Sequence, residues 1–157
     1  MAELTHLNEK GLPTMVDVSE KKVTQRKAVA RSIVELPQVV YEQLTNGDIQ
    51  TKKGSVFQTA IIAGIMASKK TGELIPLCHP LGLDNCSINI QIDNNNLIID
   101  CTASITSKTG VEMEALMGAT IAALTVYDMC KALSHDIVIK EIQLMEKTGG
   151  KNDFKRT

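Results

Sequence analysis

The stretch that decides the fold runs INIQIDNNNLIIDCTASI over residues 88–105 and then, after a short connection, VEMEALMGATIAALTVYDMCKAL over residues 111–133. In the first part, apolar residues alternate with polar ones on both sides of the polar run at residues 93–96, which predicts a β-hairpin. In the second part, apolar residues continue over a length that only a helix suits, and Thr109 and Glu112 have the spacing of a capping box at its start. A hairpin followed directly by a long helix predicts an α+β domain.

The segments on either side extend this order. Residues 26–36 alternate imperfectly, which favours a strand, and Pro37 suits the first position of a helix that would end at Asn46-Gly47. Ser55 and Gln58 form a second capping box, which predicts a helix over residues 56–70. Residues 137–145 favour a final strand. The order β, α, α, β, β, α, β predicts a ferredoxin-like sandwich, an antiparallel sheet with helices on one face whose first crossover is a helix pair.

The chain ends differ from this pattern. Residues 1–24 show no sustained period and predict an irregular arm, whereas residues 147–157 are polar and contain glycine, which predicts a flexible tail or one that a ligand orders. With 157 residues, the chain has the length of one domain, so we expect a single domain over residues 1–157.

Composition excludes several classes of protein. The 17 basic residues balance the 18 acidic ones, so no duplex nucleic acid or anionic membrane partner is expected. No secretory signal and no long uninterrupted apolar run is seen, which favours the cytoplasm. Four separated cysteines without a CxxC pair favour reduced thiols and no metal site. Two Tyr, two Phe and no Trp predict an aliphatic core.

The long helix carries acidic residues at both of its ends. Glu114 and Asp128 lie 14 positions apart in the sequence, which separates their backbones by roughly 21 Å, too far for one small substrate. If both are catalytic, a symmetric dimer has to share its sites between chains. There are simpler interpretations, in which Glu114 only interacts favourably with the positive end of the helix dipole, and Asp128 and Lys131 form an ordinary surface ion pair. The apolar neighbours of Asp128 and Lys131 instead predict a covered helix end, where the two charged groups have to be paired or functional.

Three further segments carry candidate residues. The apolar loop over residues 75–81 has two prolines, which restrict its backbone and thereby the direction of the His79 side chain. His79 is either a structural histidine or a group for proton transfer near neutral pH. Lys53 precedes the helix that Ser55 opens, which favours an anion site, with a solvated lysine as the alternative. The run from Lys147 to Lys151 contains two glycines that suit phosphate oxygens, although a mobile tail has equal support.

Three motifs carry a resemblance to a known family. They are LIPLCHPL at residues 74–81, KTGVEMEAL at residues 108–116 and ALTVYDMCK at residues 123–131, and further matches extend from Leu4-Thr5-His6 to Phe154. With these motifs, the chain closely resembles the cyclic pyranopterin monophosphate synthase family of molybdenum-cofactor biosynthesis. Ser55 stands where an acidic residue is common in that family, and both residue types cap helices.

The resemblance implies a fold, an assembly and a reaction. It implies a ferredoxin-like homohexamer, a trimer of dimers with active sites at the dimer interface. It also implies a lyase that converts (8S)-3',8-cyclo-7,8-dihydroguanosine 5'-triphosphate to cyclic pyranopterin monophosphate and releases diphosphate, without a metal or cofactor. The implied catalytic residues are Asp128, Lys131, His79 and Lys53. The implied substrate-binding residues are Leu77, Cys78, His79, Met113, Glu114 and Lys147.

Two other classes of function compete with this expectation. A non-catalytic metabolite-binding oligomer on the same fold would have no need of Asp128 and Lys131. Single-stranded RNA binding would require aromatic residues on the central strands and a basic face, and the sequence predicts neither. An enzyme is therefore the favoured class.

Overall fold

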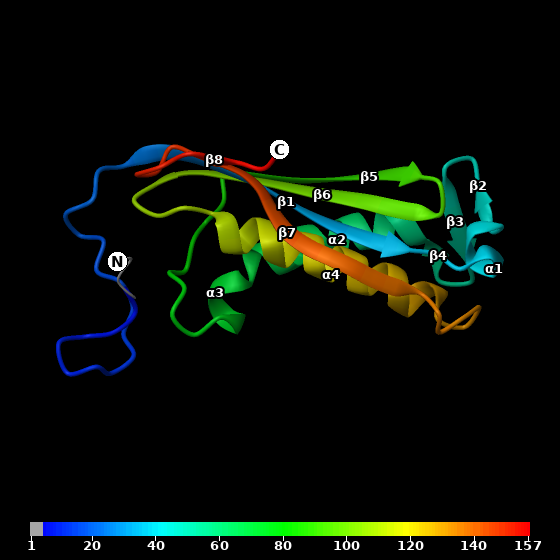
Figure 1. Cartoon of the computed structure of the whole chain (residues 1–157), viewed down its shortest axis with the longest axis horizontal. Helices are drawn as coiled ribbons and strands as arrows, with labels where there is room; N and C mark the ends of the chain where they lie inside the picture. Colours follow the sequence, from blue (N-terminus) through cyan, green and yellow to red (C-terminus); the bar gives the residue numbers. More distant parts are fainter. Residues whose placement is uncertain (1–4) are drawn as a thin grey trace.

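The central feature of the fold is a five-stranded antiparallel sheet in the order β5-β6-β1-β7-β8 (Figure 1). The computed structural model describes residues 5–157, so residues 1–4 of the predicted arm, with Leu4 of the family motif, lie outside the described part. The strands are β1 (Thr24–Glu35), β5 (Asn85–Asp93), β6 (Asn96–Ser107), β7 (Val138–Thr148) and β8 (Phe154–Lys155). Because β1 pairs with both β6 and β7, the four long strands have the ferredoxin-like order, which confirms the predicted fold class.

The helices cover one face of this sheet, with α2 (Val56–Lys69) and α4 (Glu112–Cys130) lying side by side across it (Figure 1). The short α3 (Thr71–Leu74) follows α2 directly. Alternate residues of β1 face the helices and are fully buried, namely Ala28, Ala30, Ser32 and Val34. Small side chains in β1 therefore let α4 lie close to the sheet, and the core is aliphatic, as predicted.

Helix α4 is long and apolar enough to cross a bilayer by length and composition, and among the helices of residues 5–157 it alone passes this test. Half of its apolar window is nevertheless buried inside the protein, where α4 packs against α2, β1, β6 and β7. Such packing is typical of the core helix of a sandwich. The sequence predicts a helix over residues 111–133, and the observed helix stops three residues earlier, at Cys130.

Two glycines set the close contact between α2 and α4. A Cβ atom at Gly64 would lie 2.7 Å from the carbonyl oxygen of Gly118 and would overlap the Ile88 side chain. We expect Gly64→Ala to destabilise the protein by about 1–3 kcal/mol, because the two helices have to move apart to accommodate one methyl group. Chemical denaturation measures this change. Gly82→Ala, where a Cβ meets no atom within 4 Å, is the matched control, and equal stability of the two variants would contradict the prediction.

The first crossover differs from the predicted helix pair in its first member. Helix α1 (Gln38–Tyr41) is a single turn, and a small sheet of β2 (Leu44–Thr45), β3 (Asp48–Thr51) and β4 (Gly54–Ser55) follows it. Asn46 and Gly47 have φ values of 53° and 77°, as the two-residue turn of a hairpin requires. The Asn-Gly pair, for which the sequence predicts a helix end, therefore joins two strands.

The C-terminal residues contain more regular structure than the sequence predicts. Strand β7 continues to Thr148, and the chain returns as β8, which pairs with β7 through Glu146 and Lys147. The amide of Gly149 donates a hydrogen bond to the Asp153 carboxylate at 3.1 Å, which closes the turn. The turn thereby holds Lys147 and its neighbours beside the start of β1.

Candidate active site

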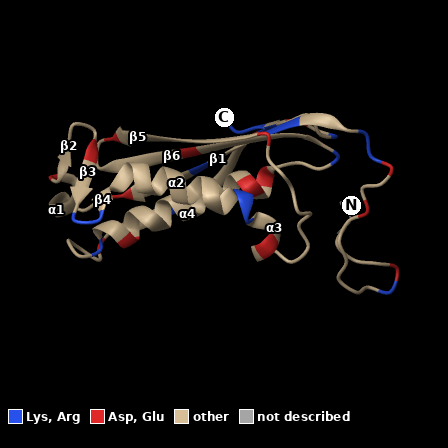
Figure 2. Ribbon diagram, turned by 180° about the vertical axis from the view of Figure 1, so that it is seen from behind, with Lys and Arg blue, Asp and Glu red and all other residues tan. Residues whose placement is uncertain are grey.

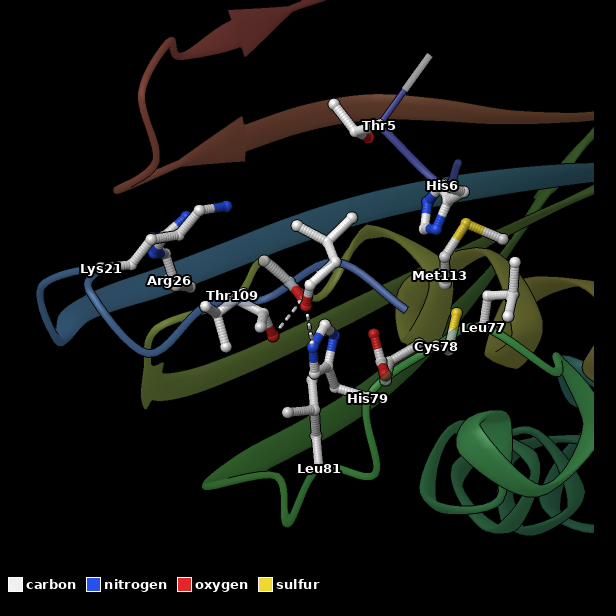
Figure 3. Close-up of a pocket in the computed structure, with 14 residues that line it drawn as sticks. Thr5, His6, Lys21, Arg26, Leu77, Cys78, His79, Leu81, Thr109 and Met113 are labelled. Atoms are coloured by element: carbon white, nitrogen blue, oxygen red, sulfur yellow. Dashed lines mark hydrogen bonds between the residues drawn. The ribbon is translucent and has the colours of Figure 1, made fainter. Parts of the chain in front are cut away.

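A cavity of about 250 Å³ lies at the N-terminal end of α4 (Figure 3). The sequence motifs contribute Leu77, Cys78, His79, Met113 and Glu114 to its walls, so the structure brings together five of the six predicted substrate-binding residues. Figure 3 shows Lys21 and Arg26 together on one side of the cavity, with Leu77, Cys78 and Met113 on the other. The cavity thus combines basic groups with an apolar wall.

The loop that carries His79 connects α3 to β5. An imidazole nitrogen of His79, Nε2, lies 2.8 Å from the carbonyl oxygen of Val16, so this nitrogen carries the proton and donates it. The contact ties the N-terminal arm to the loop through Nε2, so the other ring nitrogen, Nδ1, is not used by this contact. His79 is therefore held in one orientation within the wall of the cavity.

Among the charged residues that the structure describes, Glu114 alone is buried, with 4% of its surface exposed. Burial raises the pKa of its carboxyl group, and the nearby charge of Glu112 raises it further, against a backbone hydrogen bond that lowers it. Burial, and then the charge of Glu114, also raises the pKa of the Cys78 thiol. Cys78 thus lines the cavity as a neutral thiol and not as a thiolate nucleophile.

The raised pKa of Glu114 links folding stability to pH. The folded protein keeps the Glu114 proton to a higher pH than the unfolded chain does. The contribution of this proton to the free energy of unfolding is therefore fully present below the ordinary carboxyl pKa, and it is lost as pH rises through the pKa of Glu114 in the folded protein. We expect Glu114→Gln to raise the melting temperature at neutral pH and to flatten its decline as pH rises above the ordinary carboxyl pKa, as thermal melts across pH would measure. Glu20→Gln, at an exposed position, should leave the curve unchanged. An unaltered curve for Glu114→Gln would contradict the prediction.

Arg26 and Lys21 are cavity residues that the sequence analysis missed. The Arg26 guanidinium donates to the Thr24 hydroxyl at 2.6 Å and to the Lys108 carbonyl oxygen at 3.3 Å, which fixes its position. A signal for Arg26 was present, because its even position in β1 places it on the same face as Ala28 and Ala30. An arginine on a core-facing row requires a partner or a function.

Glu112 does not have the predicted role of a helix cap. The N-cap of α4 is Val111, no side chain caps it, and the Thr109 hydroxyl donates instead to the Gly110 carbonyl oxygen. Glu112 forms an ion pair with Lys147 at 3.3 Å. The predicted capping box is therefore wrong, because the acidic side chain has a cationic partner from β7. This pair places Lys147 at the same end of α4 as Glu114.

The C-terminal end of α4 carries a second cluster. The Lys131 ammonium donates to the Asp128 carboxylate at 2.7 Å, and both residues line a cavity of about 390 Å³ together with Lys53. The hydrogen bond and charge of Lys131, and then the charge of Lys53, lower the pKa of Asp128. Asp128 in turn raises the pKa of Lys131. Each partner therefore favours the charged form of the other, and the cluster contains an Asp128–Lys131 ion pair.

This second cluster is open within one chain. The side chains of Asp128 and Lys131 are 54% and 51% exposed, so the prediction of a covered helix end is wrong for the single chain. The prediction assumed that the apolar neighbours of Asp128 and Lys131 are buried together with them, but apolar residues such as Leu124 and Leu133 are themselves exposed. An exposed apolar surface around a charged pair is typical of a protein interface.

The predicted anion site at the start of α2 is also corrected. The carboxylate of Asp48 accepts a hydrogen bond from the Phe57 amide at 3.0 Å and another from the Ser55 hydroxyl. Ser55 accepts from the Gln58 amide at 3.1 Å, as its capping role predicts. The helix start is therefore occupied by an acidic side chain of the protein itself, and Lys53 faces Asp128 instead.

The two clusters lie at opposite ends of one helix (Figure 2). Four turns of α4 separate Glu114 from Asp128, which corresponds to roughly 21 Å. One end offers a buried carboxyl group, an oriented imidazole and two basic side chains, and the other offers an aspartate paired with one lysine, with a second lysine in the same cavity. Among residues 5–157, no group of three or more His, Cys, Asp or Glu side chains gathers closely enough to hold a metal ion.

These features define the class of the protein. It is an enzyme with a ferredoxin-like fold that has, at both ends of its long helix, groups for acid–base catalysis and basic side chains able to bind phosphate. Comparison with known proteins then gives the family. Residues 15–150 match the model of the MoaC family, so the chain belongs to the MoaC family.

Curated relatives support the same family over nearly the whole chain. The cyclic pyranopterin monophosphate synthase of Xanthomonas campestris pv. campestris (strain B100) is 54% identical over 154 residues, which covers 98% of this chain and 93% of the relative. The synthase of Staphylococcus carnosus (strain TM300) is 49% identical over 160 residues, with 99% and 98% coverage. The molybdenum cofactor biosynthesis bifunctional protein of Synechocystis sp. (strain ATCC 27184 / PCC 6803 / Kazusa) is 51% identical over 158 residues, which covers 98% of this chain and 46% of that protein.

Proposed function

We propose that this protein is a lyase of molybdenum-cofactor biosynthesis that converts (8S)-3',8-cyclo-7,8-dihydroguanosine 5'-triphosphate to cyclic pyranopterin monophosphate and releases diphosphate. The observation that carries this proposal is the match, over nearly the full length of both chains, to relatives named cyclic pyranopterin monophosphate synthase. The charges of the two clusters also suit the reaction, which has to move protons and bind a triphosphate.

The cluster at the C-terminal end of α4 has the groups for proton transfer and phosphate chemistry. Asp128 is ionised and accepts a proton, while Lys131 is protonated and donates one, because each group shifts the other's pKa toward the charged form. Lys53 lies across the same cavity and stabilises negative charge on the departing diphosphate. These three residues are the proposed catalytic cluster.

The cavity at the N-terminal end of α4 has the groups for holding the base and sugar. Burial raises the pKa of Glu114, so this carboxyl group holds its proton to a higher pH than an exposed one and is suited to exchanging a proton with the substrate. His79 is held through Nε2, and its other ring nitrogen, Nδ1, is the proposed site of proton exchange during ring opening or closure. Leu77, Cys78 and Met113 supply the apolar wall. Lys147 lies outside this lining but pairs with Glu112 at the same end of α4, and it is the proposed cation for the phosphates.

The complete site is proposed to form between two chains. In an isologous dimer, the Glu114 end of one α4 meets the Asp128 end of its partner, so that each site draws on both chains. The exposure of Asp128 and Lys131 supports this arrangement, as do the exposed apolar residues along the helix layer, Ile62, Met66, Met113 and Leu124. The proposed assembly is a homohexamer, a trimer of such dimers, in the cytoplasm.

The direct test supplies the purified protein with the cyclic dihydroguanosine triphosphate. Stoichiometric formation of cyclic pyranopterin monophosphate and diphosphate, followed by chromatography, is the expected result. GTP is the control substrate and should give neither product, because it lacks the bond between the sugar and C8 that the reaction needs. Failure of the wild-type protein to consume the cyclic substrate would overturn the proposal.

A further inference from the structure

Asp48, in β3, is a half-buried acidic residue that no step proposed above employs. Its carboxylate accepts hydrogen bonds from the Phe57 amide at 3.0 Å and from the Ser55 hydroxyl, and its own neighbour Ile49 donates an amide at 2.7 Å. One side chain therefore satisfies groups in β3, in β4 and at the first turn of α2. Hydrogen bonds to an ionised acceptor are stronger than those between neutral groups, so this junction is firmly held.

The junction fixes the hairpin made by β3 and β4. At its tip, the Thr51 hydroxyl donates to the Gly54 carbonyl oxygen at 3.1 Å and accepts from the Lys53 amide at 3.1 Å. Gly54 has a φ of 106°, a conformation that favours glycine. The tip is thus rigid in itself, and Asp48 sets where the whole hairpin lies relative to α2.

Because α2 packs along α4, the position of the hairpin relative to α2 also determines where its tip lies relative to the end of α4. Lys53, at that tip, lines the same cavity as Asp128 and Lys131. Its charge is close enough to lower the pKa of Asp128 in addition to the effect of Lys131. Lys53 is exposed, and no ion pair or side-chain hydrogen bond within residues 5–157 holds its ammonium group, so the backbone alone has to place it.

We propose that Asp48 is a positioning residue, which anchors the β3–β4 hairpin to the start of α2 and thereby holds Lys53 opposite Asp128 and Lys131. The expected effect of Asp48 on catalysis rests on the proposed function, whereas its expected effect on the position of Lys53 does not. The alternative is that Asp48 only stabilises the start of α2, as any helix cap does.

The kinetic test compares Asp48→Ala in two backgrounds. In the wild-type protein we expect kcat/KM to fall about tenfold or more, because a small displacement of a charged group is costly in an active site. In a Lys53→Ala protein the same change should cost almost nothing further, because Asp48 acts through Lys53. Asp48→Asn keeps an oxygen acceptor and should recover part of the loss. An equal loss in both backgrounds would overturn the proposal.

A second arm needs no substrate. In protein labelled with ¹³C-aspartate, NMR titration should show the pKa of Asp128 rising in Asp48→Ala, in the same direction as in Lys53→Met. Ser32→Ala is the control, because it removes a buried hydrogen bond to the Ala119 carbonyl oxygen and lowers stability elsewhere on α4. An Asp128 pKa that moves equally in Ser32→Ala, or stays unchanged in Asp48→Ala, would overturn the proposal. If the wild-type protein gives no product, the proposed function fails, and this arm still decides the role of Asp48.

Discussion

Replacing Asp128 by asparagine should lower kcat for pyranopterin formation by about 10²- to 10⁴-fold, the usual contribution of a general acid–base group. The carboxylate is ionised at neutral pH because Lys131 bonds to it at 2.7 Å and Lys53 adds a second positive charge. Asparagine has nearly the same shape but cannot accept a proton. Binding of the cyclic triphosphate should therefore change by only a few fold, so that the loss appears in kcat.

The controls for this prediction separate chemistry from charge. Asp93→Asn removes one negative charge at an exposed hairpin turn and should leave kcat unchanged. Lys131→Ala should cause a loss similar to that of Asp128→Asn, and the double variant should lose little more, because the two groups act as one unit. Wild-type turnover by Asp128→Asn would show that the carboxylate is not in the catalytic machinery.

Mixing two inactive variants should restore activity if each site is shared between chains. Glu114→Ala and Asp128→Asn damage opposite ends of α4, so a mixed dimer has one site with both defects and one site with none. When equal amounts exchange subunits freely, half of the dimers are mixed, and about a quarter of wild-type activity should return. The product assay measures this recovery, and mass spectrometry of the intact oligomer confirms the exchange.

The matched control mixes Asp128→Asn with Lys131→Ala. Both residues lie at the same end of one helix, 2.7 Å apart, so every site in a mixed dimer keeps one defect. This mixture should stay as inactive as its components. Recovery in the control, or no recovery in the first mixture after proven exchange, would contradict a site shared between chains.

The fold could be predicted because its determinants are local. The alternation in β5 and β6, the apolar length of α4 and the Ser55 cap of α2 are visible in short windows of sequence, and the structure contains each of them. The errors were local as well. Asn46-Gly47 was interpreted as a helix end although it is a strong hairpin signal, and Thr109 with Glu112 matched a capping box that does not form.

By itself, then, the sequence determined the ferredoxin-like order of elements and the motifs that place Leu77, Cys78, His79, Met113 and Glu114 around one cavity. Tertiary structure alone decided which charges meet. Lys147 reaches Glu112 from β7, Arg26 lines the cavity from β1, and Asp48 bonds to the start of α2, where the sequence predicts a phosphate site. Each of these contacts joins residues that packing brings together, and the energy of a charge depends on its neighbours in space, which no spacing along the chain specifies.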